Sequence, residues 1–578
     1  MPLTANTTNV QNPVTDFIIH VVKNAEKYIV CNNNSNEQKS LQVCDLTGKM
    51  LLKLNLNIVE NSFKLDQKGV FILNINGQNI NLTSKIVNGK IVNDFMNNRS
   101  SSLDALRGLA IIGMVLSGTI AESLPAWMYH AQVGPRSDFK FDPTIFGITW
   151  VDLVFPFFLF AMGAAIPLAL SRKLDKGAKT QSLLPSVLKR VFLLVLFAVA
   201  IYHTNPYRLG GAWNYALALL AFGLFFISFV RFASLSVKGN GFMNRLGIVL
   251  LISLIAFNVI SQPDVFMQGF KLSHNDIIIL ILANMALFGT LSWLLTRSSI
   301  VARLGIIAVF FAFRLTADAE GSWNQMVWNF NPAQFLPESL KSALYINNGW
   351  LYQMDFLKYL FIVIPGTIAG DLLVNWFSNN DTLKSKLPSK NQMWITLLLM
   401  LAMVLSNLIC LYSRYLATNF ILNIAFGLTA YFLLREPKHS LSRLYFKLSQ
   451  WGVFWLLLGT IFEAFEGGIR KDHATMSYFF ITSGLAIFTF IFFSIVMDYF
   501  GNKKVFKYVA EIGQNPMLAY VAGTFLVVPM LAIVGLMPHI NKLYEVSSWM
   551  GIAKGLIITG GMMAITVFTV RRKWFWKT

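Results

Sequence analysis

Charged side chains are scarce in this sequence: Asp, Glu, Lys and Arg make up 13% of its 578 residues, about half the share usual in soluble domains. Hydrophobic residues make up 55%, and the mean hydropathy is +0.54. This composition excludes an intrinsically disordered chain, and a soluble enzyme could not bury so much apolar surface. We therefore expect a polytopic α-helical membrane protein.

Cysteines and common catalytic motifs are also scarce. Three cysteines are too few for a disulfide framework or a thiolate metal site. No HExxH, Walker A or GxSxG motif and no dinucleotide-binding glycine fingerprint occurs, so zinc hydrolysis and ATP hydrolysis receive no support. The excess of 48 Lys and Arg over 28 Asp and Glu fits the cytoplasmic loops of a membrane protein. We expect no metal and no nucleic-acid partner.

Long apolar runs are absent from residues 1–98. Short segments of alternating polarity occur there instead, separated by turn-forming stretches such as Asn76-Gly77, and they predict a small β-sandwich. Residues 43–87 resemble the β-sandwich sorting domains at the C-termini of secreted Bacteroidetes proteins, but we expect an accessory domain over 1–98. The expected strands are 16–22, 27–31, 41–44, 50–56, 62–65, 69–75 and 80–86.

Apolar runs follow one another from Leu103 onward and predict about 14 membrane spans, within a range of 10–14. The loops rich in Lys and Arg all fall on one side if the spans alternate. The positive-inside rule places that side, and both termini, in the cytoplasm. The expected spans are 104–120, 148–170, 186–203, 212–230, 246–261, 276–296, 300–315, 356–377, 393–411, 417–434, 449–465, 478–500, 514–536 and 550–570.

Two residues near the outward mouth of the second span form a candidate catalytic pair. His130 lies in the outward loop 121–147, and Asp152 follows 22 residues later, about four residues inside an apolar helix. An acid inside a span is a candidate functional group, and a carboxylate can orient a histidine that acts as a base. The alternatives are a solvated loop histidine and an aspartate that only caps its helix.

A second charged feature lies at the cytoplasmic entry of the first span. Asp104 and Arg107 are three residues apart, so they share one face of a helix. An ion pair at the helix start explains them. The sharper interpretation is that they face an anionic ligand that approaches from the cytoplasm.

Aromatic and acidic residues in the outward loops are candidate acceptor contacts. Aromatic faces suit sugar rings, although Trp and Tyr also gather at membrane interfaces. The candidates are Trp127 and Tyr129 in the first outward loop, Trp323 and Trp328 in loop 316–355, and Glu466 before the span at 478–500.

Several ordered motifs resemble one known family. They are "LDALRGLAIIGMV", His130 in "WMYHAQ", "GITWVDLVFPFFLFAMG", "YLFIVIPGTIAGDLL", "EGGIRKDHATMSYFFITSGLA", "GQNPMLAYV" and the end "RRKWFWKT". Together they closely resemble the bacterial relatives of heparan-α-glucosaminide N-acetyltransferase, within the transmembrane acyltransferases. The resemblance covers residues 99–578, which we expect to form a transmembrane acyltransferase domain.

The resemblance implies a reaction and roles for residues. Acetyl from cytosolic acetyl-CoA would pass to the amino group of a terminal glucosamine, or a related amino sugar derived from a glycosaminoglycan such as heparan sulfate. His130 matches the family's catalytic histidine, Asp152 the acid of its "DLVFP" motif, and Arg107 the arginine of its "D-x-x-R-G" motif. Gly118 stands where animal members have an Asn, so the role of that side chain must be filled in another way, or by Ser117 or Thr119.

The sequence leaves other functions open. A secondary transporter or flippase of sugars would also have many spans, broken helices and an intramembrane acid. An O-acetyltransferase of envelope polysaccharide would differ only in the acceptor atom. Within the N-acetyltransferase, His130 is either a general base or a transient acetyl carrier. We expect the bacterial inner membrane as the location, with contact to membrane lipid, and a homodimer stays open.

Overall fold

The computed structural model describes residues 100–577 except 267–268, 318, 331, 345–353, 379–387 and 437–438, and gives only the backbone at 332–333 and 342–344. Among residues 1–99 it describes the backbone of nine strands. The chain divides into two compact units, one of Met1–Arg99 with Phe377–Leu387 and Lys438–Ser440, and one of the remaining residues.

The nine strands pair into two antiparallel sheets, with the orders β1-β2-β3-β6 and β5-β4-β7-β8-β9. Asn76 and Gly77, which the sequence predicts to form a turn, are the last two residues of β7, where they pair with Asn81 and Ile80 of β8. The β-sandwich arrangement, the boundary at residue 98 and the accessory role stay predictions. The strands are β1 (Thr8–Gln11), β2 (Phe17–Lys23), β3 (Lys27–Asn33), β4 (Lys39–Cys44), β5 (Met50–Leu56), β6 (Glu60–Lys64), β7 (Val70–Gly77), β8 (Ile80–Val87) and β9 (Lys90–Val92).

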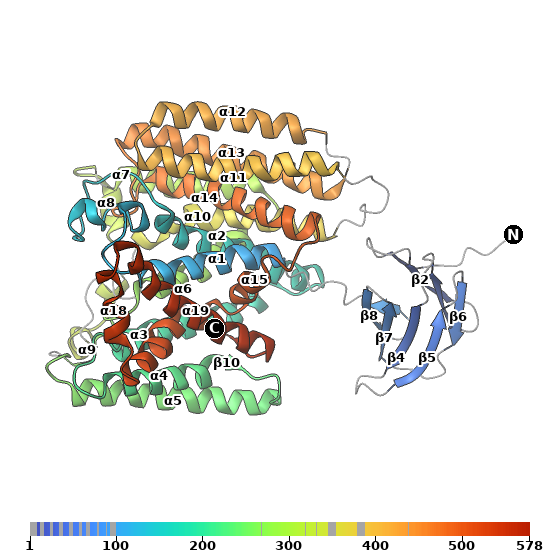
Figure 1. The fold of residues 1–578 in the computed structure, drawn as a ribbon, viewed down its shortest axis with the longest axis horizontal. Coiled ribbons are helices and arrows are strands. Elements are labelled where there is room, and N and C mark those ends of the chain that lie inside the picture. The colour runs from blue at the N-terminus through green and yellow to red at the C-terminus, as the bar shows by residue number, and fades with distance from the viewer. Residues whose placement is uncertain are drawn as a thin grey trace. The chain divides into compact units, whose positions relative to one another are not determined.

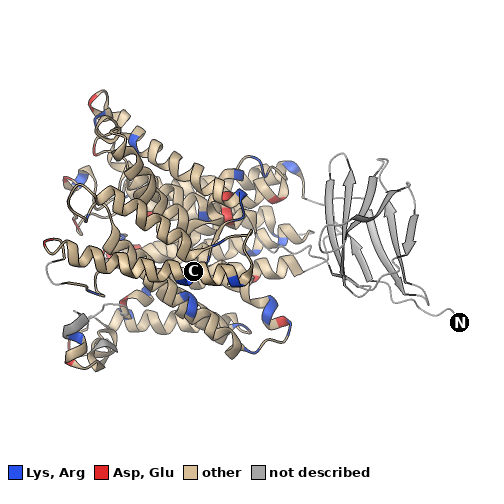
Figure 2. Ribbon diagram, turned by 90° about the horizontal axis from the view of Figure 1, so that it is seen from below, with Lys and Arg blue, Asp and Glu red and all other residues tan. Residues whose placement is uncertain are grey.

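The second unit is helical (Figure 1). Charged positions gather near the ends of its helices and leave the middle largely uncharged, as expected for helices that cross a bilayer (Figure 2). The helices are α1 (Ser101–Ser117), α2 (Trp150–Asp175), α3 (Thr180–Thr204), α4 (Asn214–Phe229), α5 (Val237–Ser261), α6 (Ile277–Thr296), α7 (Ile300–Thr316), α8 (Trp323–Trp328), α9 (Glu338–Leu344), α10 (Leu360–Ser378), α11 (Lys390–Tyr412), α12 (Leu416–Leu434), α13 (Ser440–Glu466), α14 (Met476–Ser494), α15 (Lys507–Gln514), α16 (Pro516–Ala522), α17 (Val528–Ile533), α18 (Met537–Asn541) and α19 (Gly551–Arg571).

Eleven helices among the described residues are long and apolar enough to cross a membrane. The expected polytopic helical fold is confirmed at this level. Three expected spans are shorter helices, because α1, α4 and α7 have 17, 16 and 17 residues. At 1.5 Å per residue such helices reach roughly 25 Å, somewhat less than the hydrocarbon core of about 30 Å.

The centre of the helical unit is formed by α1, α2, α10 and α14, between α12 and α13 on one flank and α4 and α5 on the other (Figure 1). α14 is almost wholly enclosed, since 89% of an apolar 18-residue stretch along it is buried, against 17% of the corresponding stretch in α12. Glycines let α2 and α10 approach closely. A Cβ on Gly163 would lie 2.3 Å from the Val363 carbonyl oxygen, and one on Gly366 would lie 2.3 Å from that of Phe160.

The basic and aromatic C-terminal segment folds back onto the helices. Its strand β11 (Phe575–Trp576) pairs with β10 (Val230–Arg231) after α4. The Trp576 ring stacks on Phe229 with centroids 5.0 Å apart, and its backbone N–H donates to the side-chain oxygen of Asn515 at 2.9 Å. Asn515 precedes α16, so the "GQNP" and "RRKWFW" motifs contact each other in the fold.

Candidate active site

The loop between α1 and α2, residues 118–149, is folded around Tyr129. This side chain is buried, with 8% of its surface exposed. Its hydroxyl accepts from the Leu124 backbone N–H at 3.0 Å and donates to the Ala121 carbonyl oxygen. Its ring meets Phe139 edge to face with centroids 5.2 Å apart. The anchored ring fixes the backbone on which the next residue, His130, is placed.

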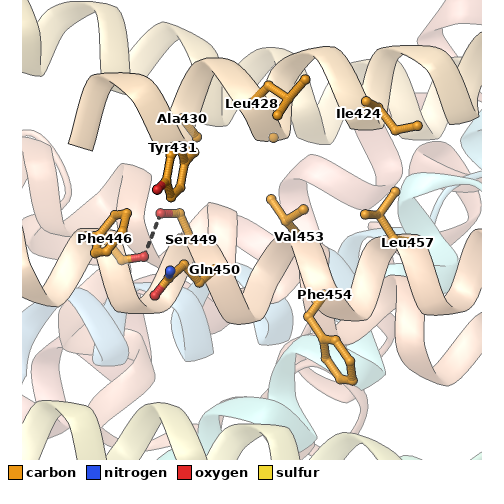
Figure 3. A pocket seen from close by; sticks show the side chains of 11 residues that line it. Ile424, Leu428, Ala430, Tyr431, Phe446, Ser449, Gln450, Val453, Phe454 and Leu457 are labelled. Carbon is orange, nitrogen blue, oxygen red and sulfur yellow. Dashed lines mark hydrogen bonds between the residues drawn. The ribbon is translucent and has the colours of Figure 1, made fainter. Parts of the chain in front are cut away.

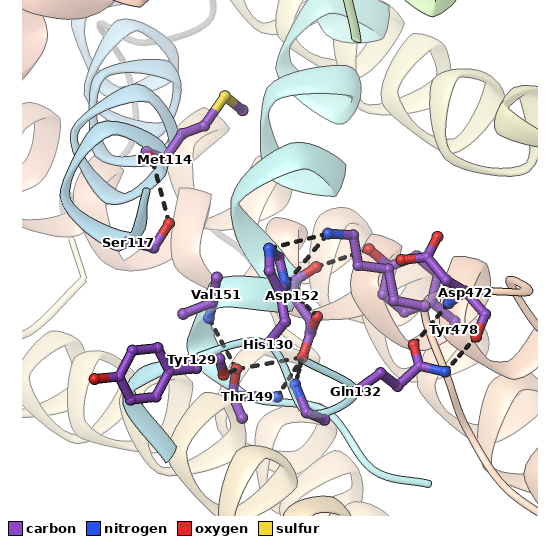
Figure 4. A network of polar contacts seen from close by, with 12 residues as sticks. Met114, Ser117, Tyr129, His130, Gln132, Thr149, Val151, Asp152, Asp472 and Tyr478 are labelled. Atoms are coloured by element: carbon purple, nitrogen blue, oxygen red, sulfur yellow. Dashed lines mark hydrogen bonds and ion pairs between the residues drawn. The ribbon is translucent and has the colours of Figure 1, made fainter. Parts of the chain in front are cut away.

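The predicted pair of His130 and Asp152 is in direct contact (Figure 4). Nδ1 of His130 lies 2.8 Å from Oδ1 of Asp152. The other carboxylate oxygen, Oδ2, accepts from the backbone N–H groups of Thr149 at 2.9 Å and Ala131 at 3.3 Å. Asp152 therefore completes the capping box that begins α2 and also holds His130, so both interpretations of this acid apply.

Buried surroundings fix the position of this carboxylate. The Asp152 side chain is 2% exposed, whereas that of His130 is 35% exposed. The hydroxyl of Tyr478, on α14, donates to the backbone carbonyl oxygen of Asp152 at 2.8 Å. The buried carboxylate thus holds Nδ1 of His130, while part of the imidazole ring remains exposed.

Lys471 is a third member of the site, and the sequence did not assign it this place. Its ammonium nitrogen lies 3.2 Å from Nδ1 and 3.3 Å from Nε2 of His130. An ammonium can only donate, and Nδ1 needs its proton for Asp152, so Nε2 is the acceptor and carries the lone pair. The loop that bears Lys471 is held by the next residue, because the Asp472 backbone N–H donates to Oε1 of Gln132 at 2.9 Å.

His130 and Lys471 open into a cavity of about 370 Å³, called here the His130 cavity. Its size is within the usual range for ligand pockets. Three of its residues, Ser117, Gly118 and Thr119, follow one another at the end of α1. The whole lining comprises Met114, Val115, Ser117, Gly118, Thr119, His130, Val154, Phe155, Ile201, Asn205, Asp276, Ile278, Lys471, Tyr520, Val521, Gly523, Thr524 and Phe525.

A second cavity, of about 200 Å³, contains Arg107 and is called here the Arg107 cavity. Arg107 pairs with Asp104 at 3.1 Å and donates to the Gly513 carbonyl oxygen at 3.1 Å. Arg190 of α3 adds a second guanidinium to the lining. The other lining residues are Phe158, Met162, Ala165, Leu194, Leu282, Pro516, Met517 and Trp576, and they are apolar.

The two cavities follow each other along the same helices, because α1, α2, α3, α6 and α16 line both. On α6, Ile278 lines the His130 cavity and Leu282, one turn further, lines the Arg107 cavity. On α3, Ile201 lines the His130 cavity, and Leu194, two turns away, lines the Arg107 cavity. Steps of four to seven residues correspond to about 6–10 Å along a helix. The arginines and His130 therefore lie at different depths of one helix cluster.

Four further predicted site residues lie outside the linings of these cavities. Trp127 is 48% and Trp323 is 69% exposed, and the Arg314 guanidinium lies 5.7 Å from the Trp328 ring centre. Glu466 accepts from the backbone N–H groups of Met476 and Ser477 at 2.7 and 2.9 Å, at the start of α14. The acceptor-binding roles of these residues and of Tyr129 stay predictions.

One further cavity, of about 370 Å³, lies between α12 and α13 (Figure 3). Apart from Tyr431, Ser449 and Gln450, aliphatic and phenylalanine residues form most of its wall, and none of the residues that line it carries a charge. Within the described part of the chain, no three His, Cys, Asp or Glu side chains gather where they could hold a metal ion.

Comparisons with known proteins agree with the motifs. A family model described as "Domain of unknown function (DUF5009)" matches residues 99–373. Heparan-alpha-glucosaminide N-acetyltransferase of Mus musculus is 34% identical over 113 residues, which cover 20% of this chain and 15% of that protein. The Homo sapiens protein of the same name is 28% identical over 166 residues, 28% of this chain and 20% of that protein. The chain thus matches a fifth or less of these relatives' length, and the resemblance is confirmed at the level of the family.

Proposed function

We propose that this protein passes acetyl from cytosolic acetyl-CoA to the amino group of a terminal glucosamine or related amino sugar on the periplasmic side of the inner membrane. The observation that carries the proposal is the contact of His130 with Asp152 and Lys471 at a cavity whose helices also line an arginine-bearing cavity. The names of the two relatives support the same activity.

The Arg107 cavity fits the donor. Coenzyme A carries several phosphate charges, which are costly to move into a bilayer. Arg107 and Arg190 offer guanidinium groups, which bind phosphate in pairs of hydrogen bonds. The apolar remainder of the cavity suits the slender pantetheine arm. In this arrangement the phosphates stay near the arginines, and the thioester extends toward His130.

The chemistry then falls to His130. Asp152 keeps the proton on Nδ1, so the lone pair of Nε2 faces the reaction. The acceptor nitrogen attacks the thioester carbonyl carbon, Nε2 takes the proton that this nitrogen loses, and the C–S bond breaks. The imidazolium then returns the proton to the departing thiolate. The ammonium of Lys471 stabilises the oxyanion that forms on the carbonyl oxygen.

A two-step route uses the same groups. Nε2 of His130 attacks the thioester first, the C–S bond breaks to release the thiolate of coenzyme A, and the acetyl group stays on Nε2. The acceptor amine then attacks this acetyl-imidazole, the bond from the acetyl carbon to Nε2 breaks, and the thiolate takes the proton that the amine loses. In both routes Lys471 must release Nε2 before the nitrogen can act. Its N–H groups are then free to turn to the oxyanion. The two routes differ in whether labelled acetyl stays on the protein when no acceptor is present.

The experiment is acetyl transfer by the purified full-length protein from radiolabelled acetyl-CoA to glucosamine. Wild type should form an amide product that resists hydroxylamine, and His130→Gln should abolish it. His539→Gln is the matched control, because His539 is an exposed histidine outside both cavities.

Each other outcome identifies a different function. A hydroxylamine-labile product would indicate an O-acetyltransferase. Uptake of unmodified sugar by proteoliposomes, without any acetylated product, would indicate a transporter. Full activity of His130→Gln would retain the enzyme class and refute the role given to His130.

A further inference from the structure

Asp276 is a carboxylate in the His130 cavity that the mechanism above does not use. It caps the start of α6, where its Oδ1 accepts from the Ile279 backbone N–H at 3.0 Å. Its Oδ2 accepts from the hydroxyl of Tyr520, on α16, at 2.9 Å. Its own backbone N–H donates to the Ala198 carbonyl oxygen of α3 at 2.9 Å. Three helices therefore hold this carboxylate in place.

This carboxylate has no positive partner among the described residues. None of the ion pairs that involve described residues includes Asp276, and each oxygen accepts one hydrogen bond although it can accept two. Asp276 directly precedes the candidate span Ile277–Thr296, and a carboxylate at the end of a membrane-spanning helix is costly when it lacks a counter-charge. Asp276 is also the one carboxylate among the residues that line the cavity. It therefore offers a place for a cation that comes from outside the protein.

The part of the cavity around His130 carries a positive charge, in contrast to the carboxylate of Asp276. The Lys471 ammonium lies 3.2 and 3.3 Å from the two ring nitrogens of His130. A cationic acceptor would be repelled there and attracted to Asp276. A neutral hydroxyl acceptor would gain nothing comparable from a carboxylate.

We propose that Asp276, positioned by Tyr520, binds the ammonium group of the acceptor, so that the site selects primary amines over hydroxyls. This inference rests on the proposed function and adds the residue that recognises the acceptor. An ammonium must lose a proton before its nitrogen can attack. The Asp276 carboxylate takes that first proton and releases it to water, and Nε2 of His130 takes the second proton during attack on the thioester.

The test compares two ligands that differ only at C2 of the sugar: methyl β-glucosaminide, with an amine, and methyl β-glucoside, with a hydroxyl. Their affinities for the full-length protein are measured by titration at pH 7. Wild type should prefer the amine by about 10- to 100-fold, the range expected for a hydrogen bond to a charged group. Asp276→Asn should bind the two ligands with nearly equal affinity, whereas Asp276→Glu should recover part of the preference.

Two controls keep the result interpretable. Asp264→Asn removes an exposed carboxylate from the loop before α6 and should leave the preference unchanged. Tyr520→Phe keeps the ring and removes the hydroxyl that positions Asp276, and it should reduce the preference without abolishing it. A melting curve of each variant shows whether it has folded.

The outcomes separate this inference from the proposed function. Equal affinity of wild type for both glycosides, or an unchanged preference in folded Asp276→Asn and Asp276→Ala, would overturn the inference even if acetyl transfer occurs. A preference that depends on Asp276 in a protein that transfers no acetyl would support the amine site and refute the acetyltransferase.

Discussion

The sharpest test of the site geometry is Asp152→Asn. The Oδ2 position of this side chain faces two backbone N–H donors, those of Thr149 and Ala131. An asparagine in its place must point its oxygen toward those donors, and its NH₂ group then points at Nδ1 of His130. Nδ1 becomes an acceptor, so the ring proton moves to Nε2. The nitrogen that faces the cavity loses its lone pair, although the side chains keep their shape.

The size of the effect follows from this change of tautomer. Loss of a hydrogen bond to a charged group costs about 1.5–3 kcal/mol, or roughly 10- to 150-fold in rate. Where a carboxylate also fixes the tautomer of a catalytic histidine, replacement by Asn can cost about 10⁴-fold. We therefore expect kcat to fall by about 10²- to 10⁴-fold, with little change in the KM for acetyl-CoA, which binds elsewhere.

The assay is single-turnover acetyl transfer to glucosamine with protein in excess over labelled acetyl-CoA. Asp142→Asn is the matched control, because Asp142 is a partly exposed acid of the same loop whose carboxylate accepts from the Thr144 hydroxyl at 2.6 Å and from its backbone N–H at 2.8 Å. It should retain wild-type rates. An Asp152→Asn protein that reacts within about threefold of wild type, a change of less than 1 kcal/mol, would refute the account of how His130 is oriented.

Further predictions concern the donor site, the helix packing and pH. Arg190→Gln should raise the KM for acetyl-CoA by about 10- to 100-fold and leave kcat nearly unchanged, as steady-state kinetics would show. Gly513→Ala should destabilise the protein by about 1–3 kcal/mol and lower its melting temperature, because the added Cβ would lie 1.8 Å from the Asp104 carbonyl oxygen. Burial, reinforced by the positive charges of Lys271 and Arg208, lowers the pKa of His274. The folded protein thus binds fewer protons than the unfolded chain, so stability is fully present above the unfolded pKa of about 6.5 and is lost as the pH falls toward the folded value. Melting temperatures at pH 7.5 and 5.5 should therefore differ less in His274→Gln than in wild type.

The two halves of the candidate site differ in how far the sequence could reveal them. His130 and Asp152 are 22 residues apart, and a loop that returns to the mouth of the next helix brings such residues together, so local reasoning reached the pair. Lys471 is 341 residues from His130, and only the packing of α14 against α2 brings its loop there. Arg190 carried a usable signal, because an arginine inside a predicted span is a functional candidate.

Hydrogen bonding gives two of the predicted acceptor contacts a structural role that the sequence did not reveal, while their acceptor-binding roles stay predictions. Tyr129 and Glu466 have polar atoms that the fold itself uses, in the loop after α1 and at the start of α14. A composition of aromatic and acidic residues in an outward loop does not reveal such internal bonds. The lengths of the spans were also beyond the sequence. Apolar runs predict α1, α4 and α7, but they do not fix the residues at which each helix begins and ends.

The central claim is that acetyl crosses the membrane while acetyl-CoA stays on one side. The most direct measurement uses sealed proteoliposomes with glucosamine trapped inside and labelled acetyl-CoA added outside. With this arrangement the account predicts labelled N-acetylglucosamine inside the vesicles. In a control in which both substrates are supplied only to the outer solution, it predicts no product. Product that forms only when both substrates share one compartment would contradict it.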